Sequence, residues 1–253
     1  MKKSRSEVEE RRRQILTMVG ENGEVTVAEL ADRLNVSLLT VRRDLQYLED
    51  EAFLERFYGG AKRGVNLKAE EVKNEVDVCR EGIARYAASL VEDGDSIFIN
   101  TSSTVLRMLK YIKSKNVTVI TNNGNAINSV CPPNVSIILT GGELRNRKGV
   151  MVGDFAIANL SKITAKKSFI GCSGVSLESG MTTEAANEVN INEMMFSKVT
   201  GKAFILADHQ KIGKNSSFVS CPIENITDVI TDTRVPDSMA EEFKKLGVRL
   251  HRV

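Results

Sequence analysis

The first part of the chain carries the apolar spacing of short helices. Residues 7–19 have apolar side chains on one helical face: Val8, Ile15, Leu16 and Val19. Gly23 follows this stripe and predicts the end of the helix. A second helix is expected over residues 26–34, where Thr26 and Glu29 have the spacing of a capping box. Two helices in close succession are therefore predicted.

A third helix is predicted over residues 38–51, with Ser37 as its N-cap. Its expected inward stripe is Leu38, Val41, Leu45 and Leu48. Two β-prone pieces, residues 53–56 and Tyr58, then frame Gly59 and Gly60 as a wing. This order is typical of a winged helix-turn-helix, in which outward side chains of the third helix and the wing reach DNA. The side chains expected to contact DNA are Thr26, Ser37, Leu39, Thr40, Arg42, Arg43, Gln46, Arg56 and Tyr58.

The pattern changes after the wing. Residues 63–74 are polar with little periodic apolar content and are expected to link two domains. The predicted division is a winged helix-turn-helix over 1–62, a linker over 63–74 and a larger domain over 75–253.

Helical and strand patterns alternate in the larger domain. Helices are expected over 75–91, 103–113 and 123–130, and strands over 96–100, 117–121, 135–140, 167–171, 203–207, 228–231 and 248–251. This alternation predicts an α/β fold with a mostly parallel sheet covered by helices.

Composition adds limits on partners and compartment. Lys and Arg number 35 against 33 Asp and Glu, so binding to DNA has to rest on where the basic residues lie. The four cysteines are far apart without a CxxC pair, which predicts reduced thiols, no metal site and no disulfide framework: Cys79, Cys131, Cys172 and Cys221. No apolar run reaches the roughly 18 residues that a membrane helix needs. A cytoplasmic protein without cofactor or membrane partner is expected.

A specific motif lies across the first and third predicted helices. It consists of Arg11, Ile15, Val19, Ser37 and the run Thr40-Val41-Arg42-Arg43-Asp44-Leu45. This pattern resembles the helix-turn-helix signature of the DeoR family of sugar-metabolism repressors. The resemblance implies operator binding and repression of a carbohydrate operon.

The resemblance continues through the larger domain, where the family looks like sugar-phosphate isomerases in fold. The segments that carry it are 93–95, 119–122, 141–142, 153, 169–171, 207–213 and 230–232. It implies a phosphorylated sugar as effector. One segment departs from the family: after the first strand an acid, a small residue, glycine and two hydroxyl residues are usual, whereas this chain has Asn100-Thr101-Ser102-Ser103-Thr104.

Polar residues follow four of the predicted strands. In open parallel sheets, ligands bind beyond the carboxyl ends of the strands, so these residues are expected to converge on one crevice. The expected effector-binding residues are Asn100, Thr101, Ser102, Ser103, Thr104, Thr121, Asn122, Gly141, Gly142, Asp208 and Lys211. Hydroxyls and free amides suit a phosphate, and Lys211 adds a positive charge.

Other functional classes stay open at this point. A sugar-phosphate isomerase with a fused DNA-binding module would need a base in the crevice, for which Asp208, Glu184 and Glu188 are candidates. An architectural DNA-binding protein would leave the larger domain as an oligomerisation surface. For a regulator, operator half-sites one helical turn apart predict a homo-oligomer, either a dimer or a tetramer.

Overall fold

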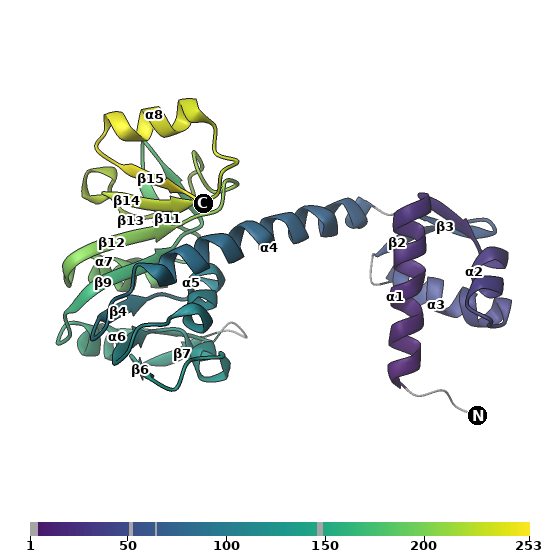
Figure 1. Cartoon of the computed structure of the whole chain (residues 1–253), viewed down its shortest axis with the longest axis horizontal. Helices are drawn as coiled ribbons and strands as arrows, with labels where there is room; N and C mark the ends of the chain where they lie inside the picture. The colour runs from purple at the N-terminus through teal and green to yellow at the C-terminus, as the bar shows by residue number, and fades with distance from the viewer. Residues whose placement is uncertain (1–4, 51–52, 64, 146–148) are drawn as a thin grey trace. The chain divides into compact units, whose positions relative to one another are not determined.

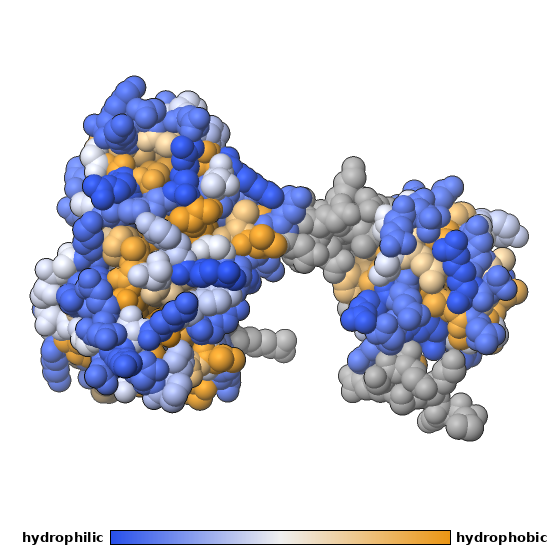
Figure 2. All heavy atoms as spheres, viewed as in Figure 1, coloured by the Kyte–Doolittle hydropathy of each residue, from blue (hydrophilic) through white to orange (hydrophobic). Residues whose placement is uncertain are grey.

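The computed structural model describes residues 5–50, 53–63, 65–145 and 149–253. The chain divides into two compact units, residues 1–76 and 77–253 (Figure 1). Charged and polar side chains cover most of the visible surface of both (Figure 2).

The N-terminal unit has the three helices that the apolar spacing predicts. They are α1 (Arg5–Asn22), α2 (Val27–Arg33) and α3 (Leu38–Asp50). The capping box is confirmed, since Thr26 and Glu29 exchange hydrogen bonds between side chain and backbone. The hydroxyl of Ser37 accepts a hydrogen bond from the Thr40 amide at 3.2 Å, which satisfies one free donor of α3.

One position of the expected inward stripe is wrong. Val41, Leu45 and Leu48 are buried, but Leu38 is 48% exposed. Leu38 is the first residue of α3, and a helical side chain tilts toward the N-terminus of its helix. It therefore points past the end of the core that Ile15 and Leu30 help to form.

The wing is a small antiparallel sheet. β2 (Leu54–Phe57) pairs with β3 (Gly60–Arg63), which confirms the predicted wing. The turn lies at Tyr58 and Gly59, one residue earlier than the predicted Gly59 and Gly60, because Gly60 already pairs with Phe57. β3 also pairs with β1 (Glu24–Thr26), a strand that the sequence pattern did not predict because it is only three residues long. This pairing joins the wing to the start of α2.

A buried carboxylate holds α1 against α3. Asp44 is 3% exposed, and its two oxygens accept hydrogen bonds from Arg11 at 2.6 Å and Arg12 at 3.0 Å. The guanidinium of Arg12 also lies 3.6 Å from the centre of the Tyr47 ring. Arg11 and Arg12 therefore have a structural role in this unit, because both bind Asp44.

Replacing Asp44 with asparagine is expected to destabilise the N-terminal unit by about 2 kcal/mol, because two partly buried guanidinium groups lose their counter-charge. Hydrogen exchange of the full chain should show faster exchange of α1 and α3 amides. The exposed acid Asp32 provides the control, and Asp32→Asn should leave exchange unchanged. Equal protection in both variants would contradict a structural role for Asp44.

A parallel sheet of seven strands forms the centre of the C-terminal unit. Its order is β15-β14-β12-β9-β4-β5-β6, and each adjacent pair is parallel. The strands are β4 (Ser96–Ile99), β5 (Val117–Thr121), β6 (Val135–Leu139), β9 (Ala165–Gly171), β12 (Val199–Leu206), β14 (Asp228–Thr231) and β15 (Arg249–Arg252). The predicted α/β class and its seven strands are confirmed.

Helices cover both faces of this sheet. Ile97, Ile99 and Phe169 pack into one core with α4 (Val65–Ser89), α5 (Ser103–Arg107) and the short turns η1 (Met108–Tyr111) and η2 (Gly124–Asn128). Phe98 and Ile170 face the opposite core with α6 (Asp154–Leu160), α7 (Val189–Ser197) and α8 (Asp237–Lys245). Apolar residues therefore occur on both faces of the central strands, as expected for a doubly covered sheet.

Short antiparallel pieces that the alternation did not predict lie beside the main sheet. They are the hairpin β7 (Glu143–Arg145) and β8 (Val150–Val152), and a small sheet of β10 (Gly174–Ser176), β11 (Gly180–Thr183) and β13 (Phe218–Cys221). The turns η3 (Ala186–Glu188) and η4 (Ile223–Asn225) complete the described elements.

The expected linker is helical rather than irregular. α4 begins at Val65, ten residues before the predicted start of the helix at residue 75, and runs on to Ser89. The segment 65–74 is rich in Lys, Glu, Ala and Leu, which favour a helix through intrinsic propensity even where no apolar stripe marks one. No helix among the described residues is long and apolar enough to cross a membrane.

Candidate functional site

The outer face of α3 presents a row of exposed side chains. Leu39 is 58% exposed, and Arg42, Arg43 and Gln46 are also exposed, while Thr40 is half-buried at the cap. The N-terminal half of a recognition helix is the part that enters the major groove. The face therefore offers two exposed guanidinium groups and an apolar side chain where base edges and phosphates would lie.

The wing adds a second exposed element. Tyr58 is fully exposed at the turn between β2 and β3. Arg56 contacts α3, because its guanidinium donates a hydrogen bond to the Gln46 side chain and lies 3.7 Å from the Glu49 carboxylate. Arg56 and Gln46, both expected to contact DNA, are thus paired with each other in the free protein.

The C-terminal unit has a cavity of about 420 Å³ at the carboxyl ends of β4 and β9. In the sheet, β5 and β6 follow β4 on one side, whereas β9 and the later strands lie on the other side. The strand order therefore reverses between β4 and β9. Ligands of open α/β sheets bind at such switch points. The lining includes Asn100, Thr101, Ser102, Ser103 and Lys211, and these five were predicted from the sequence.

Close approach of two strand ends shapes the cavity. A Cβ atom on Gly171 would lie 2.0 Å from the Ser102 hydroxyl, so only glycine fits at the end of β9. The backbone of Gly171 is hydrogen-bonded instead to Asn100, whose Oδ1 accepts from the Gly171 amide at 3.0 Å and whose Nδ2 donates to its carbonyl at 2.8 Å.

Asn100 is therefore a buried bridge between β4, β9 and α7. Its Oδ1 also accepts from the Ser102 amide at 3.2 Å, and its Nδ2 lies 3.1 Å from Oδ1 of Asn192. Because two backbone N–H groups must face the oxygen, the hydrogen bonds fix the orientation of the amide. The carboxylate that is usual in the family at this point could not donate to the Gly171 carbonyl.

Asn100→Asp is expected to lower the free energy of unfolding by about 2 kcal/mol, because it leaves the Gly171 carbonyl without a donor and buries a charge. Thermal unfolding at neutral pH should show a lower midpoint. The exposed Asn190 on α7 gives a matched control, and Asn190→Asp should not shift it. An unchanged midpoint for Asn100→Asp would show that the amide is not needed as a donor.

Charged groups of both signs surround the cavity. Lys211 follows β12 and donates from Nζ to the Cys172 carbonyl at 2.7 Å. Glu188 accepts a hydrogen bond from the Thr101 hydroxyl at 3.1 Å, and Glu184 also lines the cavity. In the described part of the lining, one ammonium group lies beside several hydroxyls and two carboxylates, which suits a ligand with both an anionic group and sugar hydroxyls.

Several residues expected at this site do not line the cavity. Thr104, Thr121 and Asn122 are buried, and Thr121 accepts from the Asn123 amide at 3.0 Å. Gly141 and Gly142 form the turn into β7, where a Cβ on Gly142 would lie 2.6 Å from the Val152 carbonyl. These residues shape the neighbouring loops, because the polar segments after β5 and β6 turn inward or into the hairpin.

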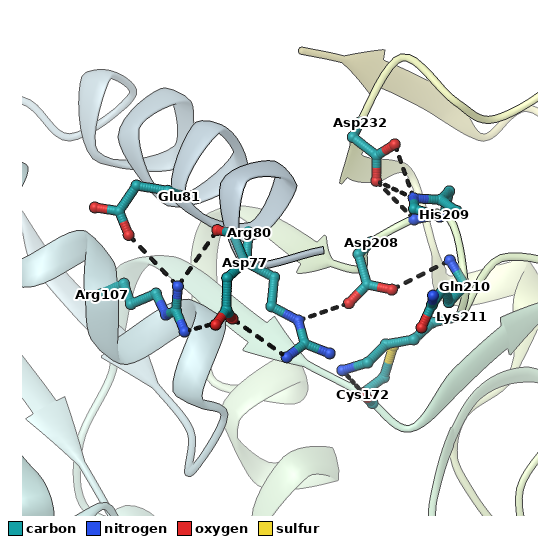
Figure 3. A network of polar contacts seen from close by, with 10 residues as sticks. All are labelled: Asp77, Arg80, Glu81, Arg107, Cys172, Asp208, His209, Gln210, Lys211 and Asp232. Carbon is teal, nitrogen blue, oxygen red and sulfur yellow. Dashed lines mark hydrogen bonds and ion pairs between the residues drawn. The ribbon is translucent and has the colours of Figure 1, made fainter. Parts of the chain in front are cut away.

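Asp208 is also absent from the lining. It is 1% exposed, and its Oδ2 accepts a hydrogen bond from Nε of Arg80 on α4 at 2.9 Å (Figure 3). Its Oδ1 accepts from the Gln210 amide at 3.1 Å. Asp208 thus joins the loop that carries Lys211 to α4, a role that strand-end reasoning did not anticipate since the partner lies 128 residues away.

Sequence reasoning missed part of the cavity wall. The missed lining residues are Leu106, Asn123, Asn125, Val150, Gly171, Ser173, Thr183 and Ala185. Cys172 lines it as well, and burial raises the pKa of its thiol to about 11, so it is protonated at neutral pH. Val150 on β8 and Thr183 on β11 belong to short strands that had no clear sequence pattern.

Comparisons with known proteins agree with this division of the chain. Residues 11–64 match the profile of a DeoR-like helix-turn-helix domain, and residues 78–233 match that of the DeoR C terminal sensor domain. The transcriptional regulator GolR of Listeria innocua is 32% identical over 250 residues, covering 94% of this chain and 96% of that protein. The lactose phosphotransferase system repressor of Staphylococcus aureus is 30% identical over 239 residues, covering 88% and 91%.

The chain also has weak similarity to solved structures. A D-ribose-5-phosphate isomerase in complex with phospho-erythronic acid aligns over 55% of this chain and 54% of that one, with 13% identity and a TM-score of 0.39. A likeness this low says nothing about activity.

Proposed function

Since the chain belongs to the DeoR family of transcriptional regulators, we propose that it represses a carbohydrate-utilisation operon and that a phosphorylated sugar controls it. The N-terminal unit binds operator DNA through α3 and the wing. The effector binds in the cavity between the ends of β4 and β9 and lowers the affinity for the operator. The protein acts in the cytoplasm.

The observation that carries this proposal is the joint presence of a DNA-binding unit and a sensor cavity in one chain. The cavity of about 420 Å³ is within the range of small-molecule sites and is large enough for a sugar phosphate. Lys211 supplies positive charge for a phosphate, while Thr101, Ser103 and Glu188 offer partners for hydroxyls. An architectural DNA-binding protein without a ligand would not need a cavity lined by such groups.

A two-stage experiment tests the proposal. Genomic fragments bound by the purified chain are selected and sequenced to find the operator. Thermal unfolding is then measured with a panel of monosaccharide and polyol phosphates beside their unphosphorylated counterparts. Ligand at 100 times its dissociation constant adds about 2.7 kcal/mol of stability, which is a shift of several degrees. The stabilising compound should also release the operator fragment.

Each stage fails separately. If no genomic fragment is enriched, the DNA-binding half of the proposal is wrong. If the operator binds but no phosphorylated sugar raises the midpoint, the effector class is wrong while the DNA-binding half stands.

The isomerase alternative has one structural argument, the two carboxylates of Glu184 and Glu188 at the cavity. Asp208, the third candidate base, is engaged with Arg80 instead. Incubating the chain with aldose phosphates and assaying for ketose phosphates tests this directly. We expect no turnover, since a sensor needs the ligand to leave unchanged.

We also propose that the chain works as a homodimer or homotetramer. Operator half-sites are read by paired recognition helices, so two subunits improve both affinity and specificity. Large apolar side chains of the C-terminal unit, among them Val130, Leu144 and Phe155, are mostly exposed and could be covered by a second copy. Light scattering after size-exclusion chromatography gives the mass, and a monomer that binds its operator tightly would contradict the proposal.

A further inference from the structure

Three side chains able to ligate a metal ion meet where α4 passes two loops of the C-terminal unit. Cys79 lies on α4, His209 lies in the loop after β12, and Asp232 follows β14 directly. Each offers one ligand atom, and the three atoms all lie within 4.8 Å of one another. Cys79 is more than a hundred positions from the other two in the sequence, so only the fold brings the three together.

The carboxylate of this cluster is held in place by the backbone. Asp232 is 2% exposed and accepts hydrogen bonds from the amides of His209 at 2.7 Å and Arg234 at 3.1 Å. The Nδ1 atom of His209 lies 3.0 Å from both carboxylate oxygens (Figure 3). Outer hydrogen bonds such as those from the two backbone amides orient ligands at metal sites, while the contact between His209 and Asp232 already places these two ligand groups side by side.

The donor set has a definite chemical preference. Thiolate, imidazole and carboxylate together suit Zn²⁺, which takes tetrahedral ligands at about 2.0–2.3 Å. Ligands of such an ion lie about 3.3–3.8 Å apart, a spacing that follows from those bond lengths. Because the three donors already lie within 4.8 Å of one another, small side-chain rotations would bring them to it.

Access and charge fit the same ion. Cys79 and His209 are only half-buried, so an ion and a water molecule can reach them. Burial raises the pKa of the Cys79 thiol, and the charge of Asp232 raises it further. Coordination to a dication deprotonates a thiol, and the thiol proton passes to water as the sulfur binds. One thiolate and one carboxylate then balance the two charges of Zn²⁺.

We propose that Cys79, His209 and Asp232 bind one Zn²⁺ ion, with water as the fourth ligand. The ion fastens α4 to the loops after β12 and β14. Cys79 is next to Arg80, which binds Asp208, and His209 is two residues from Lys211 at the cavity. Metal binding therefore strengthens the existing link between α4 and the effector loop.

Cobalt titration of the chelator-treated, full-length chain tests this site. Co²⁺ should produce a near-ultraviolet thiolate-to-cobalt band and the intense visible bands of a tetrahedral ion, both saturating at one equivalent and abolished by Zn²⁺. Cys79→Ser should remove the thiolate band and weaken Zn²⁺ binding about 100-fold or more. The half-buried Cys131 gives the matched control, and Cys131→Ser should change neither.

A second measurement uses the unmodified chain. Zn²⁺ should protect Cys79 from alkylation by iodoacetamide, read by peptide mass spectrometry, while the rate at Cys131 stays the same. Absence of the thiolate band in the wild-type chain, its persistence in Cys79→Ser, or equal alkylation of Cys79 with and without Zn²⁺ would each overturn the site. In that case His209 and Asp232 form a hydrogen-bonded pair without a metal.

Discussion

Arg43→Ala is expected to weaken operator binding by about 10- to 100-fold, the cost of losing one specific arginine contact to DNA. Arg43 is exposed on the outer face of α3, whereas Arg11 and Arg12 bind the buried Asp44. Fluorescence anisotropy with the selected operator fragment gives the affinity. The effector-induced thermal shift should be unchanged.

The matched control for this variant is Arg249→Ala. Arg249 is an exposed arginine on β15, so its loss makes the same change in net charge away from α3. Titration with salt also separates two roles for Arg43. Loss of a phosphate contact lowers the salt slope by about 1, whereas loss of a base contact leaves the slope and relaxes sequence preference. Equal affinities of the two variants would exclude Arg43 from the interface.

Lys211→Met is expected to weaken binding of the stabilising sugar phosphate by about 100-fold, because a charge-assisted hydrogen bond to an anion is lost at a partly enclosed site. Lys211 lines the cavity, and among the described residues it is the one lysine that does so. Operator binding without effector should stay normal, so the variant should act as a repressor that no longer responds. Isothermal calorimetry and operator release measure the two parts.

Lys214→Met is the control, since Lys214 is exposed and only three residues away. It should keep both affinities. A Lys211 variant that binds the effector normally would place the phosphate elsewhere in the cavity. If both lysine variants lose operator binding, the change has affected folding or assembly rather than the ligand site.

Much of the architecture was readable from local patterns. The helix-turn-helix, the wing and the seven parallel strands follow from apolar periodicity and from caps such as Thr26 and Ser37, whose effects act within a few residues. The motif that resembles the DeoR family lies in the helix-turn-helix and indicated a transcriptional regulator. Helix caps and apolar periodicity depend on residues a few positions apart, so the sequence pattern is sufficient to predict them.

The effector cavity was predicted only in part. Position after a strand placed Asn100 to Ser103 and Lys211 correctly at the cavity wall, because parallel strands end at one edge. Position after a strand does not show which polar side chains turn inward and bond to the backbone, as Thr121 does. Nor does it show which pair with a distant helix, as Asp208 does with Arg80.

By itself, the sequence determined the two kinds of domain, their order along the chain and which side chains of α3 are exposed on its outer face. Tertiary structure alone decided which partners are paired at long range: Asp44 with Arg11, Asn100 with Gly171, and Cys79 beside His209 and Asp232. The physical reason is that hydrogen bonds and ion pairs depend on distances of about 3 Å between side chains, and spacing along a chain does not record such distances once loops intervene.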